Sequence, residues 1–279
     1  MAAPFTKTVR GVSVPTIAIG VFEVEPGATE EVVADALAAG YRHVDTAVAY
    51  GNEEEVGRGL ARSGVDRSDV WVTTKVWIDD FDPPDLRRSA EASLRRLGVD
   101  RIDLLLLHWP PPDGSKLAPA LEALQRLRAD GLIRELGVSN FPAYMLRDAL
   151  QIAPEVFADQ VEYHAKLSQH ELLEVASEAD LLIEAYAPLG GSASDMVEEP
   201  VLEEIASARG ATPAQVALAW LAAQERVVLL PRSTSPERRR ENLAALEVDL
   251  TAEDIERIDE LSEQRERNFD PSFAPDWRD

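Results

Sequence analysis

The feature that most constrains this chain is a regular alternation of short apolar segments with longer amphipathic ones. The short segments have the length and composition of buried strands, and the longer ones have the apolar spacing of helices that cover a sheet. Eight such pairs follow one another between Ile17 and Ala245. Strands that alternate with helices form a parallel sheet, and eight units of this size close into a barrel. We therefore expect an α/β protein, a (β/α)8 TIM barrel that occupies residues 1–279 as a single domain.

The same pattern gives the expected boundaries. The predicted strands are 17–21, 43–45, 70–74, 102–108, 133–138, 158–162, 181–185 and 227–230. The predicted helices are 30–39, 53–63, 83–97, 117–130, 142–151, 169–179, 201–209, 213–225 and 236–245. Outside the barrel we expect an N-terminal β-hairpin over 7–15, an extra C-terminal helix over 251–262 and an irregular tail over 265–279.

A doubly wound open sheet is the structural rival, because it shares the alternation of strands and helices. That fold needs a glycine-rich turn after its first strand, and residues 20–25 contain a single glycine. Gly57 and Gly59 fall inside a predicted helix, so they do not form a dinucleotide fingerprint. The barrel is therefore the favoured architecture.

Composition excludes several classes of function. The chain has no cysteine, which rules out disulfides, thiolate metal sites and a cysteine nucleophile. No apolar run approaches the roughly 20 residues of a membrane helix, and residues 1–10 lack the apolar core of a secretion signal. With 51 acidic and 28 basic residues the net charge is −23, which disfavours a nucleic-acid partner. We expect a cytoplasmic protein that binds neither membranes nor nucleic acids.

Four ionisable residues fall at or just beyond the ends of three consecutive predicted strands: Asp45, Tyr50, Lys75 and His108. Side chains at the carboxyl ends of barrel strands face the active site. One such residue alone is usually a solvated loop residue, and a lone histidine is equally consistent with a hydrogen-bonded core position. Four together are harder to explain in that way, and Lys75 is one of only four lysines in a chain with 24 arginines.

These four residue types can protonate a developing alkoxide. A tyrosine hydroxyl has a pKa of about 10, which is high for proton transfer at neutral pH. A neighbouring ammonium stabilises the phenolate and lowers that pKa, so we expect Lys75 to act on Tyr50 in this way. Asp45 would hold Lys75 charged, and a neutral His108 would donate a hydrogen bond to a substrate carbonyl.

Seven motifs resemble those of the aldo-keto reductases, in order and without a large insertion between about Val14 and Leu261. They are GYRHVDTAVAYGNE at 40–53, TTKVW at 73–77, LHWP at 107–110, LGVSNF at 136–141, QVEYH at 160–164, AYAPLG at 185–190 and LPRSTSPERRREN at 230–242. In length and in its short loops the chain is most similar to the bacterial 2,5-diketo-D-gluconate reductases.

The resemblance implies an NADPH-dependent oxidoreductase that reduces small aldehydes, ketones or keto-sugars, with weaker use of NADH. It implies that Tyr50 is the general acid, that Lys75 and Asp45 tune it, and that His108 orients the carbonyl. The cofactor residues it implies are Ser139, Asn140, Gln160, Tyr186, Leu189, Arg232, Ser233, Thr234, Arg238, Glu241 and Asn242. It further implies that Phe22, Trp77 and Trp109 wall the substrate pocket. Members of this group are mostly monomers, so we expect a monomer.

The residues themselves also indicate a phosphate site near the end of the chain. Residues 231–242 carry four arginines after the eighth predicted strand, next to a helix N-terminus, and both features favour phosphate. We favour Arg232 and Arg238 as ligands and interpret Arg239 and Arg240 as a solvated helix face. Position 232 is usually lysine in the family, but arginine keeps the charge and can bind phosphate through two hydrogen bonds.

Two rivals to the reductase differ from it in class. A metal hydrolase needs clustered ligands, and His43, His108, His164 and His170 form no such pattern, so we expect no metal. A regulatory barrel that senses NADPH and acts on a partner protein, like the relatives associated with channels, would share every motif. Turnover of an aldehyde distinguishes the enzyme from this sensor.

The charge balance generates a testable prediction about salt. An acidic surface with few lysines suits a salt-rich cell, because carboxylate repulsion is screened over about 3 Å at 1 M salt. We hypothesise a halophilic host, and an ordinary acidic protein of a GC-rich bacterium stays open as the alternative. The halophile hypothesis predicts that activity rises with KCl concentration. A maximum below about 0.1 M KCl would contradict it.

Overall fold

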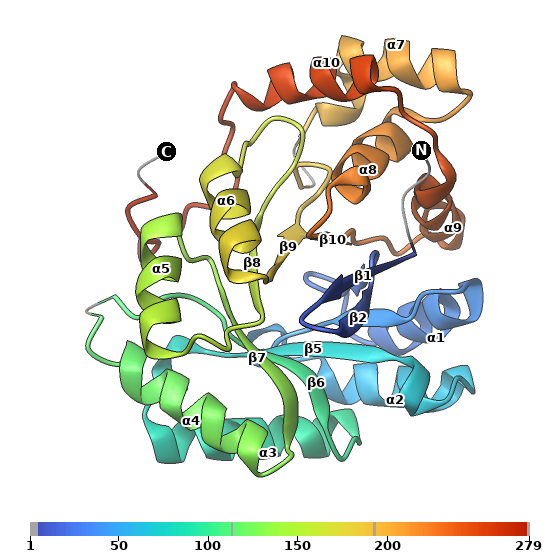
Figure 1. Cartoon of the computed structure of the whole chain (residues 1–279). Coiled ribbons are helices and arrows are strands. Elements are labelled where there is room, and N and C mark those ends of the chain that lie inside the picture. Colours follow the sequence, from blue (N-terminus) through green and yellow to red (C-terminus); the bar gives the residue numbers. More distant parts are fainter. Residues whose placement is uncertain (1–4, 113, 192–193, 278–279) are drawn as a thin grey trace.

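The computed structural model describes residues 5–112, 114–191 and 194–277. Its central element is a parallel eight-stranded sheet in the order β3 to β10 (Figure 1). The first and last strands are joined by a parallel bridge between Ile17 and Leu229, and Gly20 N donates to Pro231 O at 3.1 Å. The sheet therefore closes into the predicted (β/α)8 barrel. Its strands are β3 (Ile19–Gly20), β4 (His43–Asp45), β5 (Trp71–Val76), β6 (Ile102–Leu107), β7 (Ile133–Ser139), β8 (Ala158–Glu162), β9 (Leu182–Tyr186) and β10 (Val227–Leu230).

Helices surround the sheet (Figure 1). In the described part of the chain they are α1 (Thr29–Ala39), α2 (Glu53–Ser63), α3 (Pro83–Leu97), α4 (Leu117–Ala129), α5 (Ala143–Ile152), α6 (His170–Ala179), α7 (Pro200–Arg209), α8 (Pro213–Ala223), α9 (Pro236–Ala244) and α10 (Ala252–Ser262). The predicted extra helix is α10, which packs against α7 outside the barrel. None of the helices in the described residues is long and apolar enough to cross a membrane.

The predicted bounds of the strands and helices agree with the structure to within two residues, and two of the differences have physical reasons. The first strand pairs with β4 only at Ile19 and Gly20, and Ile17 instead forms a bridge to Leu229 across the closure. The third strand runs to Val76, so Lys75 lies within β5 rather than after it. The tail from Arg265 to Trp277 has no helix or strand, as predicted, and residues 278–279 lie outside the described residues.

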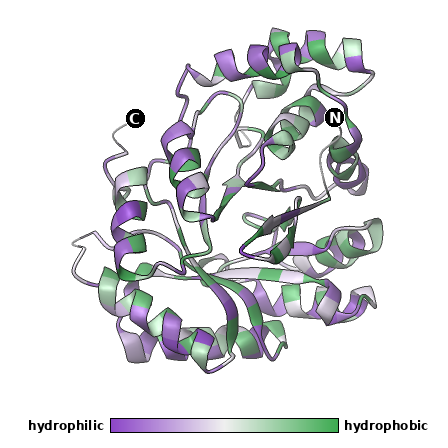
Figure 2. Cartoon of the chain, in the orientation of Figure 1, coloured by the Kyte–Doolittle hydropathy of each residue, from purple (hydrophilic) through white to green (hydrophobic). Residues whose placement is uncertain are grey.

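The core has two parts, separated by the sheet. One apolar cluster fills the space between the sheet and the surrounding helices, which carry both hydrophobic and hydrophilic residues (Figure 2). A smaller cluster fills the inside of the barrel and includes Trp71, Leu104, Leu106 and Leu182. Side chains on a strand alternate between these two environments. Reactive side chains can therefore reach a site at the end of the barrel from the inward-facing positions at the ends of the strands.

The predicted hairpin closes the floor of the barrel. Strands β1 (Thr6–Val9) and β2 (Val12–Pro15) pair antiparallel and place Val9 and Val14 in the interior cluster. Lys7 is buried beside them, and its Nζ donates to Ala222 O at 2.7 Å and Gln224 O at 2.6 Å. These carbonyls belong to the C-terminal end of α8, where a positive charge is favourable. The hairpin is thus fastened to the barrel by a lysine that caps a helix.

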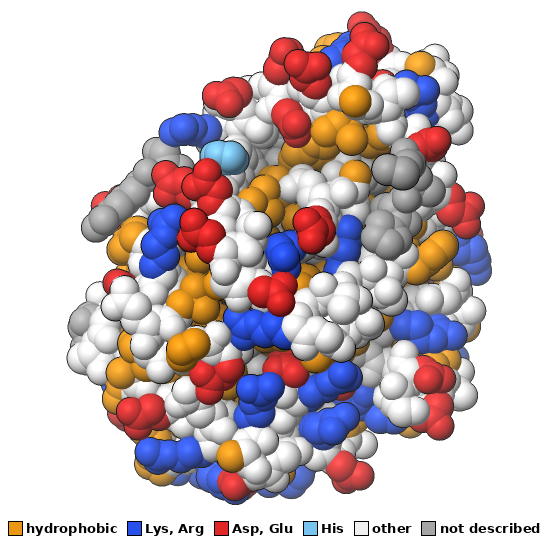
Figure 3. Space-filling model, in the orientation of Figure 1, with side chains coloured by type: hydrophobic (Ala, Val, Ile, Leu, Met, Phe, Trp, Pro, Cys, Tyr) orange, Lys and Arg blue, Asp and Glu red, His pale blue; other side chains and the backbone are white. Residues whose placement is uncertain are grey.

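Charged side chains of both signs are interspersed over the face of the molecule seen in Figure 3. On the helices several of them form ion pairs, such as Arg87 with Glu91 and Arg58 with Glu30. Exposed pairs of this kind contribute at most about 1 kcal/mol each and are weakened by salt. The fold is therefore held together mainly by its two apolar clusters.

Two glycines in α2 allow the helices around the first strands to approach closely. A Cβ atom at Gly57 would lie 2.6 Å from Leu97 O of α3, and one at Gly59 would lie 2.7 Å from Val33 Cβ of α1. A Cβ atom cannot lie so close to another heavy atom unless one of the helices is displaced. The sequence placed both glycines inside a helix, and the structure supplies the reason for them.

Replacing Gly57 by alanine tests this packing. Alanine favours an isolated helix by about 1 kcal/mol over glycine, but here the new methyl group collides with the backbone of α3. Overpacking typically destabilises by about 1–3 kcal/mol, so we expect Gly57→Ala to lower the free energy of unfolding in urea. Glu54→Ala, an exposed position of the same helix, should change it by less than about 0.5 kcal/mol. A Gly57→Ala variant more stable than the wild type would contradict the packing argument.

Candidate active site

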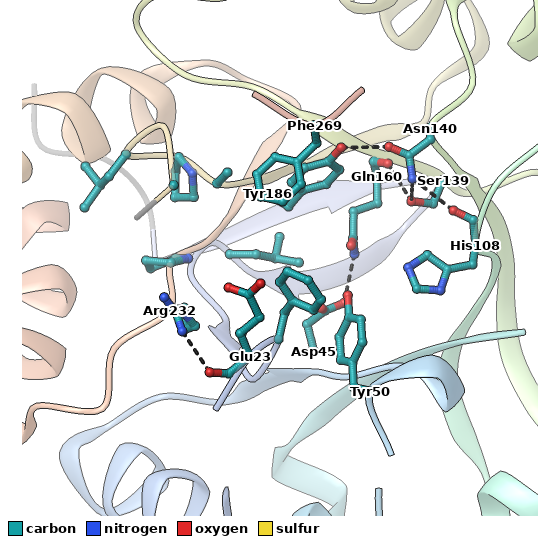
Figure 4. A pocket seen from close by; sticks show the side chains of 18 of the residues that line it. Glu23, Asp45, Tyr50, His108, Ser139, Asn140, Gln160, Tyr186, Arg232 and Phe269 are labelled. Carbon is teal, nitrogen blue, oxygen red and sulfur yellow. Dashed lines mark hydrogen bonds between the residues drawn. The ribbon is translucent and has the colours of Figure 1, made fainter. Parts of the chain in front are cut away.

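A cavity of about 640 Å³ opens at the carboxyl ends of the barrel strands. Five of the residues that line it are the last residues of their strands: Gly20, Asp45, Ser139, Tyr186 and Leu230. Figure 4 shows Tyr50 and His108 near one end of the cavity and Arg232 with Glu23 near the other. Barrel enzymes place their active sites at this face. The cavity is therefore the candidate active site.

Lys75 lies at the centre of the polar groups beneath this cavity. Its side chain is 1% exposed, and its Nζ donates to Asp45 Oδ1 at 2.8 Å, Asp45 Oδ2 at 2.9 Å and Thr46 O at 2.9 Å. The Tyr50 hydroxyl is 3.3 Å from the same nitrogen. The sequence predicted that these three side chains meet, and the structure brings them together.

Burial and charge act on these groups in opposite directions. Burial of the ammonium lowers the pKa of Lys75, but the Asp45 carboxylate and the Tyr50 hydroxyl raise it above its ordinary value. Lys75 is therefore held charged, as expected.

The predicted lowering of the Tyr50 pKa is only half right. Burial raises the pKa of Tyr50, and the opposing effect of Lys75 is smaller, so the net change is upward. The sequence argument considered the neighbouring ammonium but not the loss of water around the hydroxyl. The consequence is that Tyr50 keeps its proton at neutral pH, while Lys75 stands ready to stabilise the charge left when that proton departs.

His108 follows β6 and faces Tyr50, with ring centroids 5.7 Å apart. Burial, together with the charge of Lys75, lowers the pKa of His108 well below its usual value. The imidazole is thus neutral at physiological pH, as the sequence argument requires. Its buried Nδ1 has no hydrogen-bond partner among the described residues. A neutral ring of this kind can donate one hydrogen bond to an oxygen in the cavity.

Ser139, Asn140, Gln160 and Tyr186 lie side by side along one wall (Figure 4). The Tyr186 hydroxyl donates to Asn140 Oδ1 at 2.8 Å, and Asn140 Nδ2 donates to His108 O at 2.9 Å. Ser139 Oγ donates to Gln160 O at 2.8 Å. Asn140 has a backbone φ of 64°, a left-handed conformation that asparagine tolerates better than most residues. These four predicted cofactor residues, which lie on or directly after β7, β8 and β9, are thus neighbours.

The other predicted cofactor residues divide into two groups. Leu189, Arg232 and Arg238 line the cavity, and Arg232 donates to Glu23 O at 2.9 Å. The remaining four do not line it: Ser233, Thr234, Glu241 and Asn242. Glu241 instead accepts a hydrogen bond from Thr212 at 2.6 Å, which ties α9 to the start of α8.

The interpretation of Arg239 as a solvated residue is wrong. Its side chain is only 1% exposed, and it donates to Asp35 of α1 through Nε at 3.0 Å and to Ser233 O at 3.1 Å. The carboxylate on a neighbouring helix, which is distant in sequence, makes this burial possible. Arg239 therefore holds the loop before α9 in place, whereas Arg240 is exposed as predicted.

Aromatic side chains form the wall opposite the hydrogen-bonding groups. Phe22 lies 5.0 Å from the ring of Tyr50, and Trp77 lies 5.2 Å from His108. Phe273 of the tail packs edge-on against both Trp77 and Trp109, at 5.8 and 5.3 Å. Phe22 and the two tryptophans line the cavity, and the tail packs against the tryptophans. Their role as a substrate wall stays a prediction.

Glu162 fixes the tail over this wall. The carboxylate is fully buried and accepts the backbone N–H groups of Asn268 at 2.8 Å and Phe269 at 2.9 Å. Burial alone raises the pKa of Glu162, but bonds from His164 and these two N–H groups leave it below its ordinary value. The anchored Phe269 packs edge-on against Tyr186 at 5.5 Å.

Two buried acids lie near the site, and sequence reasoning gave neither of them a role. Glu184 of β9 is bonded to Gln160 Nε2 at 2.8 Å. Asp159 of β8 has no side-chain hydrogen-bond partner among the described residues, and burial raises its pKa well above the usual range. For Glu184 the available signal was an acid between the apolar residues Ile183 and Ala185. Within the described residues no group of three histidine, cysteine or acidic side chains could hold a metal ion.

Comparison with known proteins places this geometry in a family. The model of the Aldo/keto reductase family matches residues 17–263. An aldo-keto reductase of Mycobacterium sp. (strain KMS) is 40% identical over 274 residues, which cover 97% of this chain and 98% of the relative. The 9,11-endoperoxide prostaglandin H2 reductase of Trypanosoma cruzi is 38% identical over 272 residues. The aligned residues cover 95% of this chain and 94% of the relative.

Similar solved structures point to the same family as these relatives. A structure described as a candidate 2,5-diketo-D-gluconic acid reductase B has a TM-score of 0.94 at 35% identity, over 99% of this chain and 98% of its own. The aldose reductase of Schistosoma japonicum has a TM-score of 0.89 at 29% identity, and the match covers 98% of this chain and 96% of that structure's chain. The fold, the family model and the relatives agree, and the chain belongs to the aldo/keto reductase family.

Proposed function

We propose that this oxidoreductase reduces the carbonyl group of small aldehydes, ketones or keto-sugars with NADPH, and that Tyr50 is its general acid. The observation that carries the proposal is the position of the Tyr50 hydroxyl, 3.3 Å from a buried lysine that is itself bonded to Asp45. A phenol held beside a fixed ammonium in a dry site is suited to giving up a proton and stabilising the phenolate that remains.

The residues present fit a nicotinamide dinucleotide. Ser139, Asn140 and Gln160 offer amide and hydroxyl groups for a carboxamide, and the ring of Tyr186 lies on the same wall. Arg232 and Arg238 are the arginines in the lining, and they stand near the N-terminus of α9, where Ser235 caps the helix. Arginine and a helix N-terminus both favour phosphate, which supports the 2′-phosphate of NADPH at this end.

The contacts of Tyr50, Lys75 and His108 support the following proton transfer. Bound NADPH supplies the hydride for the carbonyl carbon. The neutral His108 donates a hydrogen bond to the carbonyl oxygen and holds it beside Tyr50. The O–H bond of Tyr50 breaks as its proton passes to that oxygen, and the electron pair stays on the phenolate. Lys75 stabilises this charge, while Asp45 keeps the ammonium in place.

The aromatic wall supports a substrate whose body is apolar or flat. Phe22, Trp77 and Trp109 enclose the side of the cavity next to Tyr50 and His108. A regulatory barrel would bind NADPH equally well, so turnover of a simple aldehyde is the measurement that separates the two functions. Binding of NADPH without its oxidation would favour the sensor.

Removing the transferable proton tests the role of Tyr50. Tyr50→Phe keeps the ring but loses the hydroxyl, so we expect kcat for NADPH oxidation with an aldehyde to fall by at least ~10²-fold. NADPH binding, followed by fluorescence, should be retained. Tyr144→Phe on α5 controls for the loss of a tyrosine hydroxyl outside the cavity lining. Turnover of Tyr50→Phe near the wild-type rate would refute the assignment.

The phosphate end is tested by comparing two arginines of α9. Arg238→Ala should weaken NADPH binding by ~10-fold or more, the scale of a charge-assisted hydrogen bond, and weaken NADH binding much less. Arg240→Ala removes the same charge two residues further along, outside the cavity lining, and should leave both affinities nearly unchanged. Equal losses for the two cofactors in Arg238→Ala would mean that the 2′-phosphate binds elsewhere.

A further inference from the structure

Glu184 is a carboxyl group inside the barrel to which the proposed reaction assigns no role. It lies on β9 between apolar neighbours, and its side chain is fully buried. Burying an acid in a dry interior is unfavourable unless it is hydrogen-bonded or neutral. Its position directly beneath the candidate active site suggests that it serves that site.

The contact of Glu184 is with Gln160. Gln160 Nε2 donates to Glu184 Oε2 at 2.8 Å and to Asp45 Oδ2 at 2.8 Å. One amide nitrogen has two N–H groups, so both are used by these two acids. The dashed line from Gln160 to Asp45 in Figure 4 marks one of these bonds.

These contacts fix which way the Gln160 amide points. Burial raises the pKa of Asp45, and the Lys75 ammonium opposes this rise. Both Asp45 oxygens accept a hydrogen bond from that ammonium. The group that faces it must therefore be the nitrogen of Gln160. The amide oxygen is left over, and it has no hydrogen-bond partner among the described residues although Gln160 lines the cavity.

Glu184 can serve as an acceptor without carrying a charge. Burial, and then the charge of Asp45, raise the pKa of Glu184 to about 8, so it is protonated at neutral pH. The charged and titratable groups that face it are Asp45, Lys75 and His43, whose Nε2 is 3.9 Å from Glu184 Oε1. A second ionised carboxylate here would compete with Asp45 for Lys75. The neutral acid avoids this and still accepts the bond from Gln160.

We propose that Glu184, in its neutral form, is a positioning residue that directs the Gln160 nitrogen toward Asp45 and the Gln160 oxygen toward the cavity. This inference rests on the proposed function, because the unpaired oxygen would then accept a hydrogen bond from the carboxamide of a bound nicotinamide. Glu184 would thereby help to hold that acceptor in place for the cofactor.

Two variants of nearly equal size separate positioning from packing. Glu184→Gln keeps an oxygen acceptor at the same place, whereas Glu184→Met fills the space without one. We expect Glu184→Met to weaken NADPH binding by about 3- to 10-fold, as for the loss of one net hydrogen bond, and to lower kcat as well. Glu184→Gln should bind NADPH within about 2-fold of the wild type.

The matched probe is 2′-phospho-ADP-ribose, which has the phosphates and adenosine of NADPH but no nicotinamide. Its affinity should be the same in the wild type, Glu184→Met and Glu184→Gln. Equal NADPH affinity in all three proteins would overturn the inference, and so would a parallel loss of both ligands in Glu184→Met, which would indicate packing alone. A wild type that binds neither ligand would instead refute the proposed function.

The neutral state of Glu184 has its own test. An acid whose pKa is raised by folding stabilises the fold fully below its unfolded value of about 4.3, and that contribution is lost as the pH rises through the folded value. The thermal midpoint of Glu184→Gln should therefore gain on the wild type as the pH rises from 5 to about 8, and the difference should then level off. A difference that is constant over this range would show that Glu184 is ionised throughout and would overturn the neutral assignment.

Discussion

The ion pair between Lys75 and Asp45 is the interaction on which the rest of the site depends. Both side chains are removed from water, and the ammonium is bonded to the carboxylate through both oxygens. A buried pair contributes little net stability, but removing one partner leaves an unpaired charge and destabilises by about 3–5 kcal/mol. The pair is therefore better explained by the proposed reaction than by the fold, since it places a fixed positive charge beside Tyr50.

The barrel makes this arrangement possible. Asp45, Lys75, Gln160 and Glu184 come from four strands, and only the closed sheet brings their inward faces together. All four side chains are buried next to the apolar interior of the barrel, and Glu162 holds the tail at the cavity through two backbone N–H groups. In so dry a site each polar group needs a specified partner, and the network from Lys75 to Glu184 supplies one for most of them.

The lysines of this chain also have specified polar partners. In the described residues each of the four has a specific polar partner: Lys7 caps α8, Lys75 binds Asp45, Lys116 binds Asp82, and Lys166 binds Asp195 and Glu199. The exposed ion pairs elsewhere use mostly arginine. This division supports the view that the few lysines are kept where a compact ammonium suits the geometry.

The sequence by itself determined the barrel, because the periods of strand and helix are local properties that repeat eight times. It also located Asp45, Tyr50, Lys75 and His108 at one end, because the carboxyl ends of parallel strands share one edge. It did not determine the burial of Arg239, which depends on Asp35 about two hundred residues away. Nor did it determine the raised pKa of Tyr50 or the contact of Glu184 with Gln160. Loss of water and contacts across the barrel exist only once the sheet has closed, so the tertiary structure alone decides them.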